Sequence, residues 1–391
     1  MRALRTVIVV LLVALGFLGG YFAGWYVHGD NLGSLTSSQQ DAARKAGELQ
    51  QRIIEELQKR YYKPVDVGKL SQAGVDGMLE SLDDPYTVYL TPKENRELQV
   101  MESGQYSGIG ASLQKKNGTV LITNTFPGSP AAKADLNPGD AILSVDGRPV
   151  AEEDLDTAVA RIKGEEGTTV RLEVRRKGGD AVEALTLTRR RIEIPQTSRR
   201  MEKAGAVKVG YVQLYGFAEL AARDVRRDIA ALDAKGAEFY IFDLRYNPGG
   251  LLSQAVDVTN VFMRGLVTTT QGHNSPREVY EAEGAVSTDK PLVVLVNEYS
   301  ASAAEIVTGA LKDSDRATVI GTRTFGKGLV QTIVTMSGGA ALKLTTAVYL
   351  TPNGTDINEK GIAPDVVVKD DAKTDEDEVL QRALAYIAAR R

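Results

Sequence analysis

The chain has 391 residues, of which 43% are hydrophobic and 25% are charged, and its formal net charge is −4. This length allows two or three domains with their own cores, and the charge gives no reason to expect nucleic acid as a partner. Cysteine is absent, which excludes disulfides, thiolate zinc sites and a cysteine nucleophile, and the sequence contains only two histidines, His28 and His273.

The first domain, residues 1–30, is predicted to be a signal anchor. Residues 7–27, VIVVLLVALGFLGGYFAGWYV, carry no charge and are long enough to cross a bilayer as a helix. Arg2 and Arg5 precede this stretch, which predicts a cytoplasmic N-terminus and export of the rest of the chain. A cleaved signal peptide is the alternative, although no clear A-x-A site follows. We therefore expect a single-pass cytoplasmic membrane protein with its other domains extracytoplasmic, in the periplasm or at the cell exterior.

The next domain, residues 31–103, is predicted to be mainly helical. Apolar residues recur at helical spacing in 37–62. A second helical segment around 67–82 is stopped by Pro85 and Pro92.

Three further segments follow. Residues 104–194 contain short strand-like runs separated by Gly and Pro turns, which predicts a compact β-rich module. In residues 195–370, continuously apolar strands alternate with helical segments. This alternation predicts an α/β core in which helices cover a largely parallel sheet. Residues 371–391 are charged and are predicted to form an amphipathic C-terminal helix.

Two serines lie where a buried strand is predicted to pass into a helix, in NEYSASAAEIVTGAL at 297–311. Helix capping alone would explain one of them, because Ser302 and Glu305 fit a capping box. The alternative is that Ser300 or Ser302 is a nucleophile, and spacing does not choose between the two.

A nucleophilic serine in this chain needs a base other than histidine. His28 lies at the expected membrane boundary and His273 in a polar loop, which disfavours a Ser-His-Asp triad. Lysine is the chemical alternative, because an amine in a poorly hydrated pocket loses its proton more readily than in water. Lys327 lies between two glycines before an apolar strand, and Gln331 falls on the same strand face, where its amide could orient the amine. A turn residue is the plainer interpretation of this lysine.

Two other motifs point to different chemistry. GTRTFGKG, residues 321–328, matches a phosphate-binding loop, but Gly328 stands where a magnesium-binding Ser or Thr is needed and a strand-like run follows. SLQK, residues 112–115, matches the S-x-x-K of penicillin-binding enzymes but lies in a strand-like run. Both matches are therefore disfavoured, and we expect no metal and no cofactor.

Acyl transfer also needs hydrogen-bond donors for an oxyanion. In DLRYNPGG, Gly249 and Gly250 follow a predicted strand, and their amides can approach a ligand closely. The helix that begins near Ser302 offers a second donor. A simple strand-to-helix turn is the alternative interpretation of the glycines. Both donor sets are expected at the carboxyl ends of neighbouring strands, where open α/β sheets bind ligands.

From about residue 83 to 368 the chain resembles the carboxyl-terminal processing (tail-specific) serine proteases. The matching segments are DDPYTVYLTPKE, YSGIGASL, TNTFPGSPAAKADLNPGDAILSVDG, DLRYNPGGLL, SASAAEI, GTRTFGKGLVQT and YLTPNGTDINEKGIAPDVVV. The resemblance implies a core of the crotonase/Clp protease type with an inserted PDZ domain. It also implies that the flanking helices form dimer or higher-oligomer contacts.

The resemblance further implies roles for individual residues. Ser302 corresponds to the nucleophile, Lys327 to the general base and Gln331 to its supporting amide. The oxyanion donors correspond to an amide of the NPGG turn, at Gly249 or Gly250, and to the amide of Ala303. Ser300 would then be the helix cap.

The module at 104–194 resembles a PDZ domain, with SGIGA as its carboxylate-binding loop. Its glycines would let successive amides surround a chain-terminal carboxylate while the peptide adds as a strand to the sheet edge. These amides belong to Gly108, Ile109, Gly110 and Ala111. Where relatives commonly carry Arg-Gly, this chain has Lys163 and Gly164, so the resemblance does not extend to a charged latch between PDZ and protease parts.

The resulting hypothesis is a membrane-anchored serine endopeptidase. It would recognise free apolar C-termini of protein substrates and hydrolyse peptide bonds nearby, without metal or nucleotide. The alternative is a catalytically silent PDZ adaptor on the same fold. Retention of Ser302, Lys327 and Gln331 disfavours the adaptor, because such a chain has no chemical reason to keep all three.

Overall fold

The computed structural model describes residues 36–273, 276–371, 374 and 376–390. The membrane helix expected at 7–27 and the domain boundary at residue 30 lie outside the described residues. In the part of the chain that is described, no helix combines the length and the apolar character that crossing a bilayer requires.

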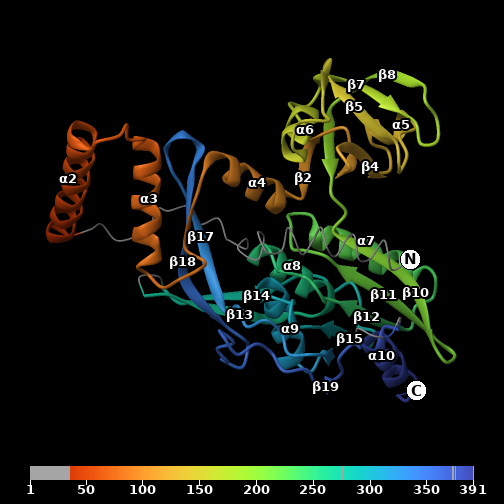
Figure 1. Ribbon diagram of the computed structural model, residues 1–391. Coiled ribbons are helices and arrows are strands. Elements are labelled where there is room, and N and C mark those ends of the chain that lie inside the picture. The colour runs from red at the N-terminus through yellow and green to blue at the C-terminus, as the bar shows by residue number, and fades with distance from the viewer. Residues whose placement is uncertain (1–35, 274–275, 372–373, 375, 391) are drawn as a thin grey trace. The chain divides into compact units, whose positions relative to one another are not determined.

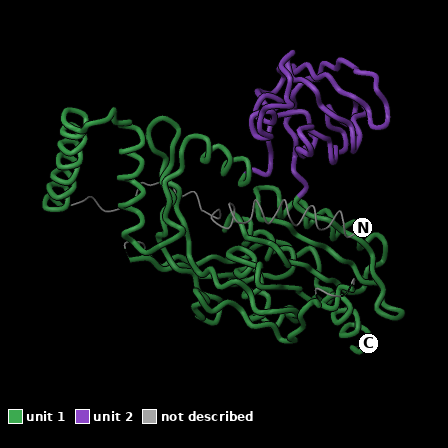
Figure 2. Tube along the Cα trace, viewed as in Figure 1, with its two compact units in different colours: residues 1–102, 196–391 green, residues 103–195 purple. Residues whose placement is uncertain are grey.

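The chain divides into two compact units (Figure 2). The larger unit comprises Met1–Glu102 and Gln196–Arg391, and the smaller unit is Ser103–Pro195. The smaller unit is therefore an insertion between two parts of the larger one.

The smaller unit is an antiparallel β structure with two short helices. Its six-stranded sheet has the order β3-β4-β5-β7-β8, with β6 paired to β5, and a separate ribbon pairs β2 with β9. Val170, Leu172 and Val174 of β7 are fully buried and alternate with more exposed polar residues, the pattern of a half-buried strand. The elements are β2 Gln105–Gly108, β3 Ala111–Lys116, β4 Thr119–Thr125, α5 Pro130–Lys133, β5 Ala141–Val145, β6 Arg148–Pro149, α6 Leu155–Ile162, β7 Thr169–Arg175, β8 Val182–Thr188 and β9 Arg190–Glu193.

The larger unit is built on a six-stranded sheet of order β10-β11-β12-β15-β16-β19 (Figure 1). All neighbours from β11 to β19 are parallel, and only β10 is antiparallel to β11. Every residue of the central strand β15, LVVLV, is buried, as expected for a parallel strand covered on two faces. The strands are β10 Thr197–Ala204, β11 Val207–Leu214, β12 Phe239–Asp243, β15 Leu292–Val296, β16 Ala317–Gly321 and β19 Val366–Val367.

Helices cover this sheet on two faces. Alternate strand residues such as Phe242 and Val294 pack with α7 (Ala221–Asp233), α8 (Leu252–Phe262) and α9 (Ala303–Asp313). The residues between them, whose side chains point to the other face of the sheet, pack with α10 (Glu378–Ala388); Ile241 and Val293 are examples. The predicted layering of helices on a parallel sheet is thus present. Helix α10 lies within residues 371–391, the segment predicted to form a C-terminal helix.

A second sheet of the larger unit is antiparallel throughout its pairings. It contains β1 Val88–Leu90, β13 Gly265–Gln271, β14 Glu278–Ala282, β17 Leu329–Thr335 and β18 Ala341–Leu350, with a 3-10 turn at Ser337–Gly339. The hairpin of β13 and β14 was not predicted, and His273 lies in its connection. The remaining helices are α2 Ser37–Arg60, α3 Val67–Glu80 and α4 Pro92–Ser103.

Candidate active site

Ser302 lies in the tight turn between strand β15 and helix α9. Its φ of 54° and ψ of −116° are unusual for a residue with a side chain, and such backbone strain gathers at functional sites. The residue is 6% exposed and directly precedes the first residue of α9. The turn therefore presents a hydroxyl at the carboxyl end of a parallel strand.

Ser300 has a different part in this turn. Its hydroxyl donates to the carbonyl of Leu244 at 2.8 Å and accepts from the amide of Asn297 at 2.9 Å, and the residue is fully buried. Ser300 therefore joins two strand ends and does not cap α9, which corrects the expectation from the sequence. The N-cap position of α9 is occupied by Ser302.

Lys327 lies in the loop before strand β17, with its side chain in a buried environment. The residue is 2% exposed, and its Nζ lies 4.5 Å from the centroid of the Tyr86 ring. Burial lowers the pKa of Lys327 from its ordinary 10.5 to about 8, although the carboxylates of Asp84 and Glu305 oppose this shift. At pH 7 about a tenth of this amine is therefore unprotonated and able to accept a proton, far more than at an ordinary lysine.

The glycine before the lysine is required by the path of the loop. Gly326 has φ +92°, and a methyl group there would lie 2.9 Å from the amide of Gly361. A side chain would push the loop away from the 358–361 segment and displace Lys327.

Glu305 links the serine turn to the lysine loop. This carboxylate is 0% exposed and accepts four hydrogen bonds. The donors are the amides of Ser302 at 2.9 Å, Gly326 at 2.7 Å and Lys327 at 2.9 Å, and the Thr324 hydroxyl at 2.6 Å. The Tyr349 hydroxyl is within 3.1 Å of the Ser302 carbonyl and 2.5 Å of the Lys327 carbonyl. Two buried side chains thus hold the backbones of the predicted nucleophile and base together.

Gln331 is also buried, and its side chain makes no hydrogen bond to the Lys327 amine. It lies on β17 and is 1% exposed. Neither its Oε1 nor its Nε2 has a hydrogen-bond partner among the described residues.

The NPGG turn lies against the serine turn. Gly249 has φ +102°, and a methyl group on it would lie 2.8 Å from both the Ala301 carbonyl oxygen and Ser302 Cβ. Its own amide donates to Asn247 Oδ1 at 2.9 Å. In the described part of the chain, the amides of Gly250 and Ala303 donate no hydrogen bond to protein. Of the predicted oxyanion donors, these two amides are the ones not already engaged.

The predicted carboxylate-binding loop joins strands β2 and β3 of the smaller unit. Gly108 ends β2, Ala111 begins β3, and Ile109 is buried in the core of the unit. The Ile109 carbonyl accepts from Ala131, and the Gly110 carbonyl accepts from the Ser129 hydroxyl at 3.1 Å. The loop is thus held through its carbonyl groups.

Comparison with known protein families identifies the family of both units. Residues 208–368 match peptidase family S41, residues 97–175 match the PDZ domain, and residues 14–94 match the activating protease CtpB N-terminal domain. The carboxy-terminal processing protease CtpA of Bacillus subtilis (strain 168) is 38% identical over 317 residues, covering 81% of this chain and 67% of the relative. The chain belongs to the S41 carboxyl-terminal processing proteases.

Two further relatives agree with this assignment. A carboxyl-terminal-processing protease of Synechocystis sp. (strain ATCC 27184 / PCC 6803 / Kazusa) is 37% identical over 80% of this chain and 74% of its own. The solved structure of a photosystem II D1 C-terminal processing protease is 30% identical, with a TM-score of 0.52 over 91% of this chain and 99% of that one. This S41 peptidase is therefore an enzyme of the serine peptidase class whose substrates are peptides or proteins.

The two rival motifs do not have the structural context they need in this S41 peptidase. The sequence after Gly328 forms strand β17, where a phosphate-binding loop requires a helix. Ser112 and Lys115 lie in strand β3, where the penicillin-binding motif requires a helix.

Several residues around Lys327 of the S41 peptidase were not predicted from the sequence. Tyr86 and Asp84 belong to the DDPYTVYL segment, and Tyr349 lies on β18. Lys343, also on β18, is fully buried, and burial together with Lys327 lowers its pKa to about 6. Burial raises the pKa of Glu102 to about 7. The available signal for Lys343 was its spacing of two residues from Ala341, which places both residues on the same face of the strand.

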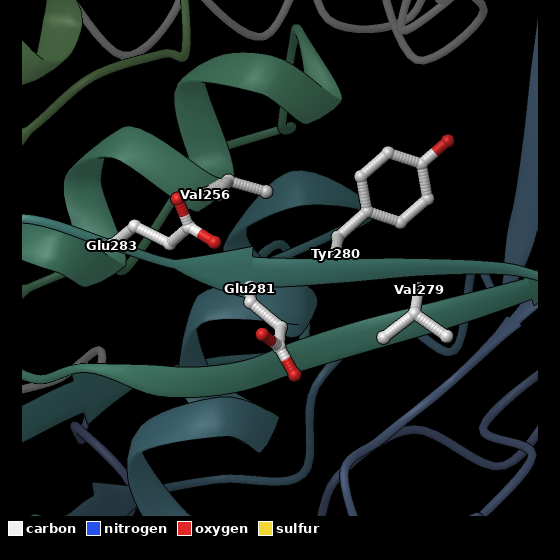
Figure 3. A pocket seen from close by; sticks show the side chains of 5 residues that line it. All are labelled: Val256, Val279, Tyr280, Glu281 and Glu283. Atoms are coloured by element: carbon white, nitrogen blue, oxygen red, sulfur yellow. The ribbon is translucent and has the colours of Figure 1, made fainter.

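A shallow hollow on the S41 peptidase lies away from these residues. It is lined by Val256, Val279, Tyr280, Glu281 and Glu283, from α8 and the β14 region (Figure 3). It includes none of the predicted site residues. In the described part of the chain, no group of three or more His, Asp or Glu side chains is arranged to hold a metal ion.

Proposed function

We propose that this S41 peptidase cuts polypeptides with a Ser302–Lys327 catalytic pair. The buried amine of Lys327 carries the proposal, since a lysine with a pKa near neutrality can act as the general base that this chain lacks in histidine. The shared hydrogen bonds of Glu305 and Tyr349 support it, because they fix the two backbones relative to each other.

In the proposed reaction, Ser302 Oγ attacks the scissile carbonyl carbon while neutral Lys327 takes the hydroxyl proton. The backbone amides of Ala303 and of the NPGG turn stabilise the negative charge that develops on the carbonyl oxygen. In the NPGG turn the Gly250 amide is available for this, because it donates no hydrogen bond to the described part of the protein. Lys327 then returns its proton to the leaving amine. A water molecule, deprotonated by the same lysine, hydrolyses the acyl-enzyme and regenerates Ser302. Gln331, whose buried amide has no hydrogen-bond partner among the described residues, would turn toward the amine and orient it during these steps.

We further propose that the PDZ domain binds the free C-terminus of the substrate. The loop between β2 and β3 supports this, since its position in the fold matches the expected carboxylate-binding site. An apolar terminal side chain would lie beside the carboxylate. Recognition of the tail would deliver the adjoining polypeptide to the protease unit.

The experiment compares the wild-type protein with Ser302→Ala on peptides that differ only in a free or an amidated C-terminus. Mass spectrometry identifies the cleavage sites. We expect Ser302→Ala to abolish cleavage and amidation to reduce the rate of cleavage by the wild type. Ser253→Ala, which alters an exposed serine of α8, is the matched control and retains activity. Cleavage by Ser302→Ala would refute the catalytic assignment, and equal rates on the two peptides would refute tail recognition.

We propose that the enzyme is anchored in the cytoplasmic membrane with its catalytic part outside the cytoplasm. The uncharged stretch at 7–27, with Arg2 and Arg5 before it, supports this topology. Protease added to intact cells or spheroplasts should degrade the catalytic part, and protection in both preparations would contradict the proposal.

We also propose a homodimer or higher oligomer through the flanking helices. The 24-residue helix α2 supports it, because none of its residues is buried within the chain. Analytical ultracentrifugation of the wild type should show an assembly larger than one chain, and a single monomeric species would refute this.

A further inference from the structure

Two tyrosines form a stacked pair on the loops that carry the proposed catalytic groups. The rings of Tyr246 and Tyr299 are 5.4 Å apart between centroids, with an interplanar angle of 17°. Tyr246 is 42% exposed and Tyr299 is 51% exposed. Large aromatic side chains that remain this exposed beside a site are candidates for contacts with a ligand.

One buried side chain fixes the positions of both tyrosines. Asn297 Oδ1 accepts from the amide of Tyr246 at 3.0 Å and from the amide of Tyr299 at 3.1 Å. Tyr246 is held at φ +62°, a conformation that is strained for a bulky residue. Strain of this kind persists where the surrounding structure imposes it, and it gathers at ligand-binding sites.

The pair is continuous with the proposed catalytic site. Tyr246 is three residues before Gly249, and Tyr299 is three residues before Ser302. The two loops are joined next to these positions, since the amide of Ala301 donates to the Asn247 carbonyl at 3.0 Å. The two rings therefore belong to the joined loops that carry Ser302 and the NPGG turn.

The charges around Tyr246 favour a cationic ligand. Its electrostatic neighbours are the carboxylates of Glu298 and Asp370 and the guanidinium of Arg245. Arg245 is buried and paired with the carboxylates of Asp243, Asp377 and Asp370, so its charge is already balanced and Asp370 is engaged, which leaves Glu298 as the carboxylate open to a ligand. Glu298 is exposed and holds the Thr322 hydroxyl at 2.8 Å. Electron-rich ring faces beside carboxylates are the surroundings that an arginine side chain prefers.

We propose that the Tyr246–Tyr299 pair is a subsite for a basic side chain of the substrate, arginine above all, near the scissile bond. This inference rests on the proposed function, because it takes Ser302 as the point of attack. The guanidinium would stack on the exposed ring surface and face Glu298. The subsite would add a side-chain preference close to the cut that is separate from recognition of the C-terminus.

The test uses peptides with one common C-terminus in which a single position near the cleavage site is Arg, Gln, Leu or Phe, scanned on both sides of the cut. We expect the wild type to hydrolyse the best Arg peptide with a kcat/KM about fivefold above its Gln counterpart, mainly through KM. Tyr299→Ala and Glu298→Gln should bring this ratio toward one, while Tyr299→Phe keeps most of it. Tyr62→Ala, which alters an exposed tyrosine outside the pair, should leave the ratio unchanged.

The outcomes separate this inference from the proposed function. The subsite alone is overturned if Ser302→Ala is inactive but the wild type shows no preference for Arg at any position, or prefers Leu or Phe. An Arg preference that survives in both Tyr299→Ala and Glu298→Gln also overturns it. Activity of Ser302→Ala on these peptides would instead remove the catalytic assignment on which the subsite depends.

Discussion

Replacing Lys327 with methionine should abolish cleavage and, at the same time, stabilise the folded protein at neutral pH. Methionine keeps most of the side-chain volume but carries no charge. The loss of the general base should lower kcat by at least about 10³-fold. The gain in stability follows from the buried position of the amine, which is 2% exposed and has a folded-state pKa of about 8 against an ordinary 10.5.

The magnitude follows from proton linkage. A folded-state pKa below the unfolded value means that the unfolded chain binds the proton more tightly, so protonation destabilises the fold. With these two pKa values the destabilisation is about 3 kcal/mol at pH 7 and below, and it declines to about 1 kcal/mol at pH 10. Loss of the contact with the Tyr86 ring offsets about 1 kcal/mol of the gain. Lys327→Met should therefore be more stable than the wild type by about 2 kcal/mol at pH 7, with the advantage gone near pH 10.

Urea unfolding at pH 7 and pH 10 measures this difference, and peptide cleavage measures the activity. Lys203→Met, at an exposed position of β10, is the control and should change the free energy of unfolding little at either pH. In the wild type, the rate of cleavage should rise with pH as Lys327 loses its proton, with a midpoint near 8. A Lys327→Met protein that is destabilised equally at both pH values would refute the idea of a desolvated amine.

Three further substitutions test the scaffold around the site. Glu305→Gln places an amide NH2 group among backbone NH donors, so we expect the free energy of unfolding in urea to fall by about 3 kcal/mol and cleavage to be lost. A variant as stable as the wild type would contradict the role of the carboxylate. Gly249→Ala puts a methyl group 2.8 Å from Ser302 Cβ, so kcat/KM should fall by about 10²-fold on a standard peptide, and an unchanged value would show that the turn yields freely. Asp377→Ala removes both the N-cap of α10 and two hydrogen bonds to buried Arg245, so the free energy of unfolding should fall by about 3 kcal/mol; a loss below about 1 kcal/mol would mean that the ion pair contributes little.

The parallel sheet was predictable from sequence because its strands are continuously apolar. Leu292–Val296 is the clearest case, with every residue buried. The hairpin of β13 and β14 was not predicted, although the valine and threonines of β13 favour a strand. Those threonines are buried against neighbouring strands, and Thr268 Oγ1 donates to the Leu350 carbonyl at 2.7 Å. The partner strand β18 is distant in the sequence, so no local pattern indicates this pairing.

Ser302 and Lys327 lie on loops that share hydrogen bonds to one carboxylate, and the residues that surround them were not predicted. Ser302 and Lys327 were expected as a pair, and Glu305 was expected only as the second half of a capping box. That the same carboxylate also accepts from the Lys327 loop depends on how two distant segments meet, which no local pattern encodes. Tyr86 contacts the amine from far along the chain for the same reason.

The ribbon of β2 and β9 has a consequence for how the inserted unit is attached. Gln105 is the cross-strand partner of Glu193, so the first and last strands of the inserted unit lie side by side. The flanking residues are each tied to the larger unit, Glu102 by the amide of Glu219 and Gln196 by the amide of Tyr215. A tight turn of a few residues would therefore bridge the gap after excision of 103–195, at little cost in loop-closure entropy. Such a shortened chain should keep the fold of the larger unit, which makes the insertion a detachable module and not a structural support.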